Sequence, residues 1–240
     1  MTTIAGVDGC PGGWISVERD TITGDIFAEV LPTTKDLRDR ARHLAVLTVD
    51  IPIGLAEAGP RQCDVEARRL LTSIRGSSVF PAPVRAAIYA ATYTEACERS
   101  EVACGKRLSK QAHAIMWRIR EVDEMLRSEP ELQGRVREVH PEVCFYAWAG
   151  RPMQHAKKTG EGRAERLELV NQHFRGAFDR LRPSIPQRFA ADDDLWTRLR
   201  HSGPPSAFFG GRPRRSQRYP QRIGSASAWR WSPRSSRVAA

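Results

Sequence analysis

Two aspartates of this 240-residue chain lie where a charge is energetically unfavourable. Asp8 ends the short apolar run IAGVD before a glycine-rich stretch, and Asp50 lies inside LTVDIPIGL, an apolar run of strand length. A carboxylate in such a run must be hydrogen-bonded, paired or bound to a cation, because burying an isolated charge is costly. Two strand-end carboxylates on one sheet suggest a divalent-metal site. Equally, Asp8 could cap the glycine turn and Asp50 the turn ahead of Pro52.

Two further acidic residues, Glu138 and Glu142, flank His140 in the segment 135–148, which we interpret as a strand. Either glutamate would add a ligand to the site if this strand neighbours the first one. Residue type alone favours a structural role for both. His140 is expected to be a structural strand-end histidine, and the remaining histidines show no ligand spacing.

Polar residues that could contact phosphate occur in two places. Lys110 and Gln111 open a predicted long helix, where residue type alone favours ordinary surface positions. Arg85 is one of four arginines around the loop SSVFPAP, with Arg61, Arg68 and Arg75. These could hold phosphates, although arginines on helices are usually solvated. The five cysteines are scattered without a Cys-x-x-Cys pair, so we expect neither a disulfide framework nor a zinc site.

The elements that must position these residues follow from periodicity and from turn residues. Strands are predicted around IAGVD, WISVERD, DIFAEVL and LAVLTVDIPIGL and over 135–148, and helices over 33–43, 61–71, 84–98, 109–127 and 163–182. The helix after Ser109 is the most clearly amphipathic, with Ala112, Ile115, Met116, Ile119, Val122 and Leu126 on one face. Hairpin-linked strands favour antiparallel pairing, and helix-separated strands favour parallel additions. The sequence therefore predicts an α/β fold with a mixed five-stranded sheet flanked by helices.

The net charge of +10 is confined to one end of the chain. Residues 195–240 hold ten arginines and no lysine, aspartate or glutamate, so residues 1–194 are neutral. We expect one folded domain over 1–194 and a disordered Arg/Ser/Pro/Gly-rich tail over 195–240. With no membrane-length apolar run and no signal-peptide pattern, the protein is expected to be cytoplasmic and not membrane-bound.

Ordered motifs resemble those of the DUF429 family (domain of unknown function 429): GVDGCPGGW, DIPIGL, RQCDVEARRLL, SSVFPAP, LSKQ, EVHPEVCF and ADD. The resemblance implies a ribonuclease H-like fold and a predicted nuclease. It implies that Asp8, Asp50, Glu138 and Asp193, the last beside Asp192, hold Mg²⁺ or Mn²⁺ for phosphodiester hydrolysis of nucleic acid. Lys110 would neutralise charge developing on the phosphate.

The tail departs from the family pattern, which continues after the acidic pair as a helix. A reading-frame slip near codon 195 explains the change better than an evolved arm, because permitted codons read two bases later can encode a helix like the missing one. The alternative is an arginine-rich arm that contacts phosphates and makes binding salt-dependent. The genomic sequence around codon 195 tests the slip.

A metal-dependent nuclease-like protein, impaired if the C-terminus is altered, is the leading hypothesis. One alternative is a non-catalytic module that binds nucleic acid or a protein partner on the same fold. A second is a phosphate-binding ATPase-like protein, which shares a glycine hairpin after an N-terminal aspartate. The ATPase alternative needs a second domain and a second phosphate loop, for which 240 residues leave no room.

Overall fold

The computed structural model describes residues 2–185 and Arg188. Within them, one sheet has the strand order β3-β2-β1-β4-β5. The strands are β1 (Thr3–Cys10), β2 (Gly13–Asp20), β3 (Ile26–Leu31), β4 (Val46–Val49) and β5 (Val136–Glu138). β1, β2 and β3 are joined antiparallel, while β4 pairs parallel to β1 and β5 parallel to β4. The predicted mixed five-stranded sheet is confirmed.

The β1–β2 turn depends on Gly13. Its φ is +122°, and a Cβ added there would lie 2.3 Å from the Leu31 carbonyl oxygen and 2.4 Å from that of Pro32. Only glycine combines that backbone conformation with that close approach. The turn is therefore held tightly against the end of β3.

The helices are α1 (Thr34–Ala41), α2 (Gln62–Arg75), α3 (Arg85–Ile88), α4 (Tyr93–Cys104), α5 (Lys110–Ser128), α6 (Pro141–Ala149), α7 (Gly160–His173) and α8 (Ala177–Leu181). Short 3-10 helices cover Gly76–Ser78, Pro130–Gly134 and Arg182–Ser184. Side-chain caps mark the start of α1 and of α5. Thr33 forms a capping box with Asp36, and the Ser109 hydroxyl accepts the Ala112 amide.

Two predicted helices are each divided in two. The segment 84–98 contains the short α3 and the start of α4, because Thr92 has an extended backbone and caps α4 with its side chain. The segment 163–182 contains most of α7 and then α8, separated at Gly176, whose φ is +65°. Apolar periodicity continues across both breaks, so the pattern alone did not reveal them.

The prediction of a strand over 135–148 is wrong for most of its length. β5 ends at Glu138, and Pro141 is the first residue of α6. Proline is favoured at the first position of a helix because that position needs no amide donor. Glu142 therefore lies in a helix and not in a strand.

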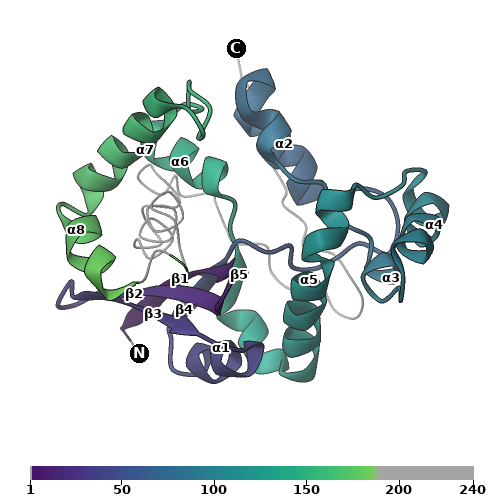
Figure 1. Cartoon of the computed structure of the whole chain (residues 1–240), viewed down its shortest axis with the longest axis horizontal. Helices are drawn as coiled ribbons and strands as arrows, with labels where there is room; N and C mark the ends of the chain where they lie inside the picture. The colour runs from purple at the N-terminus through teal and green to yellow at the C-terminus, as the bar shows by residue number, and fades with distance from the viewer. Residues whose placement is uncertain (1, 186–187, 189–240) are drawn as a thin grey trace, which may run out of the picture.

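The two faces of the sheet carry two separate cores. On one face, α1 and α5 pack on Val7, Leu47 and Val49. On the other face, residues of α6, α7 and α8, including Phe145, pack on Ile15 and Val17. Figure 1 shows α1 on one side of the sheet and α6, α7 and α8 on the other.

Two further expectations concern the cysteines and the membrane. All five cysteines are free, as expected, and Cys10, Cys97 and Cys144 are buried. In the part of the chain that the structure describes, no helix has the length and apolar character needed to cross a bilayer.

Candidate functional site

Asp8 and Asp50 lie at the carboxyl ends of neighbouring parallel strands. Val7 is the register partner of Val49, so the next residue on each strand is an aspartate. The ladder continues to this point, because the Asp50 amide donates to the Val7 carbonyl at 3.4 Å. Adjacent strands are about 4.8 Å apart, so the two aspartates are close neighbours.

Both aspartates belong to the sheet face covered by α6–α8. Val7, Val49 and Ile51 all belong to the core on the α1/α5 face. Because side chains alternate along a strand, the intervening Asp8 and Asp50 point to the other face. Each aspartate is only partly buried, and one Asp8 carboxylate oxygen accepts the Gly9 amide at 2.7 Å.

The hairpin that carries Asp8 is held by Arg118 of α5. Its guanidinium donates to the carbonyls of Cys10 at 2.6 Å and of Gly13 at 2.7 Å. The same group lies 5.0 Å from the Trp14 ring centroid. A Cβ added at Gly9 would lie 2.9 Å from Arg118 Nε, so the helix and the hairpin fit closely here. The role of Arg118 was not predicted from the sequence, because an arginine on the flank of an amphipathic helix gives no distinctive signal.

Glu138 is near the aspartates in the ladder but belongs to a different set of contacts. It is the register partner of Val49, so alternation places its side chain on the face opposite to Asp8 and Asp50. Both of its oxygens accept from Arg61 at 2.7 Å, and one also accepts the Ile53 amide at 2.8 Å.

Arg61 is the centre of a buried ion-pair network. It also donates to Asp64 at 2.5 Å and 3.1 Å and to the Ile53 carbonyl at 2.8 Å. Burial alone would lower the pKa of Arg61, but its bonds to Glu138 and Asp64 raise the pKa well above the usual value. The permanently charged Arg61 thus joins the start of α2, the loop after β4 and the end of β5.

Glu142 and His140 lie at the start of α6. Glu142 is buried, and one of its oxygens accepts from Arg166 of α7 at 2.6 Å. Its other oxygen has no hydrogen-bond partner among the residues that the structure describes. His140 Nε2 is 3.0 Å from the Ser78 carbonyl oxygen, and burial lowers the pKa of this histidine. Glu142 therefore helps to join α6 to α7.

The three residues expected to bind phosphate differ in their surroundings. Lys110 and Gln111 are exposed in the first turn of α5. Arg85 is bound internally, to Glu57 at 2.9 Å, to Asp123, and to the Leu55 carbonyl at 3.2 Å. Lys110 and Gln111 are thus accessible to a ligand, whereas Arg85 has three protein acceptors.

The structure brings together Asp8 and Asp50 but not the whole predicted metal site. Asp193, with Asp192, lies outside the described residues. Among residues 2–185 and Arg188, no three His, Cys, Asp or Glu side chains are grouped so that they could hold a metal ion. The candidate site is therefore the aspartate pair at the carboxyl edge of β1 and β4.

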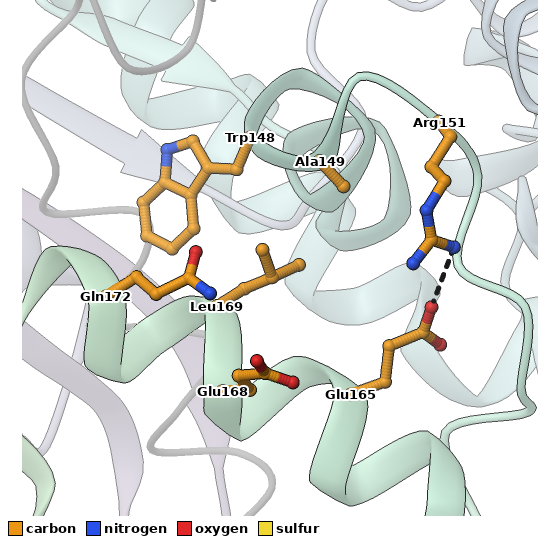
Figure 2. A pocket seen from close by; sticks show the side chains of 7 residues that line it. All are labelled: Trp148, Ala149, Arg151, Glu165, Glu168, Leu169 and Gln172. Atoms are coloured by element: carbon orange, nitrogen blue, oxygen red, sulfur yellow. Dashed lines mark hydrogen bonds and ion pairs between the residues drawn. The ribbon is translucent and has the colours of Figure 1, made fainter.

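A separate hollow lies between the end of α6 and α7. Its volume is ≈ 260 Å³, and Figure 2 shows the side chains that line it, Trp148, Ala149, Arg151, Glu165, Glu168, Leu169 and Gln172. Arg151 is paired with Glu165 at 3.1 Å. None of the predicted site residues that the structure describes lines this hollow.

Comparison with known proteins identifies one family. The model of the family described as "Protein of unknown function (DUF429)" matches residues 6–196, which include Asp8, Asp50 and Asp193. No curated protein and no solved structure matches the chain significantly.

Proposed function

We propose, from the premise that this chain belongs to the DUF429 family, that it is a metal-dependent nuclease on a ribonuclease H-like fold. The observation that carries the proposal is the register of β1 and β4, which makes Asp8 and Asp50 neighbours at one sheet edge. Three antiparallel strands followed by two parallel ones are also what the resemblance to ribonuclease H-like proteins implies.

The aspartate pair fits Mg²⁺ or Mn²⁺. Magnesium is typically bound through one or two carboxylates while it keeps several waters, and two neighbouring carboxylates on rigid strands provide such a donor set. Bound there, the ion would supply an activated water and stabilise the leaving oxygen of a phosphodiester. Asp193, outside the described residues, is proposed as the further carboxylate.

The residues around the pair have positioning roles in this proposal. Gly9 donates its amide to Asp8 and thereby orients that carboxylate. Arg118 fixes the hairpin that carries Asp8 by binding the carbonyls of Cys10 and Gly13. We place Glu138 with this support and not with the ligands, because Arg61 and the Ile53 amide already bind its oxygens.

Cleavage of labelled single-stranded, duplex, branched and hybrid nucleic acids in Mn²⁺ tests the proposal. We expect cleavage by the chain, or by a version with the reading frame restored after residue 194, and loss of it in Asp8→Asn and Asp50→Asn. Asp25→Asn is the matched control, because Asp25 is exposed and lies in the β2–β3 turn, away from the carboxyl edge of β1.

Absence of cleavage in both versions of the chain would count against a nuclease and favour a binding module. Cleavage that survives in Asp8→Asn and Asp50→Asn would show that another site, or a contaminant, is responsible. Loss of cleavage in Asp25→Asn would indicate a general effect of the substitution on folding.

A further inference from the structure

A stripe of α5 exposes a lysine, an alanine and a tryptophan in one line. Lys110, Ala114 and Trp117 are all exposed. Residues spaced by four and three positions lie above one another on a helix, and Lys110 and Trp117 are separated by about 10 Å along the axis. Trp117 is 47 % exposed, which is unusual for so large an aromatic side chain.

Trp117 adjoins the hairpin that carries Asp8. The Arg118 guanidinium lies over one face of the Trp117 ring, 4.3 Å from its centroid, so a base would stack on the other face. The same guanidinium donates to the carbonyls of Cys10 and Gly13, at the turn that follows Asp8. A ligand stacked on Trp117 would therefore lie next to the β1–β2 turn that follows Asp8, on the α5 face of the sheet and opposite to the face to which Asp8 and Asp50 point. Figure 1 shows α5 beside the sheet.

The other end of the stripe is basic. Lys106 and Lys110 are exposed on either side of the α5 N-cap, and no acidic residue lies in the first turn of the helix. Arg107, in the same stretch, is paired with Glu101 at 3.1 Å. The amino end of a long helix and two lysines together favour an anionic group such as phosphate.

We propose that this stripe, Lys110–Ala114–Trp117, binds single-stranded nucleic acid, with a base stacked on Trp117 and a phosphate at Lys110. Single strands are favoured over duplex because paired bases do not offer their faces for stacking on an aromatic side chain. Passage of the bound strand around the β1–β2 turn to Asp8 and Asp50, on the other face of the sheet, rests on the proposed nuclease function, whereas the binding itself does not.

Fluorescence anisotropy with fluorescein-labelled oligo(dT), in EDTA so that no cleavage occurs, measures the binding. The full chain is used, so that every variant carries the same arginine-rich tail. We expect Trp117→Ala to weaken binding about tenfold and Trp117→Phe to restore most of the affinity. Lys110→Ala should weaken the salt dependence, reducing the magnitude of the negative slope of log affinity against log salt concentration by about 0.7.

The matched control is Phe27→Ala. Phe27 is 43 % exposed, and Arg40 lies 5.3 Å from its ring centroid, but it belongs to the edge strand β3. Its loss should leave the affinity unchanged. Thermal unfolding of each variant checks that the comparison is made between folded proteins.

Equal oligo(dT) affinities of Trp117→Ala, Phe27→Ala and the unaltered chain would overturn the inference. So would a Trp117→Ala substitution that weakens binding to a duplex of the same length as much as it weakens binding to oligo(dT). The binding and cleavage measurements together also separate this inference from the nuclease proposal. Binding that depends on Trp117, without any cleavage in Mn²⁺, would support the binding stripe and contradict the nuclease proposal. Cleavage that Asp8→Asn abolishes, with oligo(dT) affinity unaffected by Trp117→Ala, does the reverse.

Discussion

Arg61 binds both carboxylate oxygens of Glu138, each at 2.7 Å, although the arginine side chain is only 6 % exposed. The pair joins α2 to the end of β5 on the sheet face opposite to Asp8 and Asp50. Two kinds of acidic residue therefore meet at one edge of the sheet. Glu138 is used in a structural ion pair, while Asp8 and Asp50 form the candidate metal site.

Removal of Arg61 should strongly destabilise the fold. Arg61→Ala leaves the buried Asp64 and the partly buried Glu138 without their cation. Loss of one partner of a buried ion pair typically reduces the free energy of unfolding by about 3–5 kcal/mol. Urea unfolding measures the loss. Arg69→Ala is the control on the same helix, because Arg69 is 73 % exposed and its pair with Glu66 should contribute less than about 1 kcal/mol. Similar midpoints for the two variants would contradict the role given to Arg61.

Divalent metal should stabilise the chain through the aspartate pair. At a Mn²⁺ concentration of about 100 times Kd, binding to the folded state adds roughly 2.7 kcal/mol, or about 5–10 °C in Tm for a chain of this size. Asp8→Asn and Asp50→Asn should remove this shift, and Asp25→Asn should keep it. Scanning calorimetry with and without EDTA measures the difference. An unchanged shift in Asp8→Asn would place the ion elsewhere.

Acid should destabilise the protein through His140. Burial lowers the pKa of His140 in the folded state. Below about pH 6.5, His140 is therefore protonated to a greater extent in the unfolded chain than in the folded chain. The free energy of unfolding should therefore fall as the pH drops, with this group contributing at most about 1.4 kcal/mol per pH unit. Urea titrations of the chain and of His140→Gln at pH 7.5 and 5.5 isolate the effect, and an equal loss in both would assign it to other groups.

Gly13 should be far less replaceable than another glycine with positive φ. Gly13→Ala combines a strained backbone with a Cβ only 2.3 Å from the Leu31 carbonyl oxygen, so we expect a loss of roughly 3 kcal/mol or more. Gly24→Ala is the matched control, because Gly24 has φ +80° and no atom of the described residues lies within 4 Å of an added Cβ. This substitution should cost about 1–2 kcal/mol. Thermal unfolding compares the two variants. Equal losses of stability would show that the β1–β2 turn can shift to accommodate a Cβ at position 13.

The apolar periodicity of the sequence predicted an element well where one face of the element is buried and a capping residue marks its start. α5 begins after Ser109 as expected, and Met116, Ile119 and Val122 of its predicted face are buried. The strand prediction over 135–148 was wrong because Pro141 is compatible both with the end of a strand and with the start of a helix. The side chains that hold Asp8 and Glu138 in place were not predicted, since Arg118 and Arg61 are distant from them in sequence.

By itself, the sequence determined the family, the mixed α/β composition and the unusual cost of charges at Asp8 and Asp50, because these follow from ordered motifs, periodicity and local polarity. Only the tertiary structure decided which acidic residues are neighbours and which are already paired. Strand register placed Val7 opposite Val49, and alternation then put Glu138 on the other face, where Arg61 binds it. Register and long-range ion pairs arise from the packing of distant segments, and no local pattern in one chain encodes them.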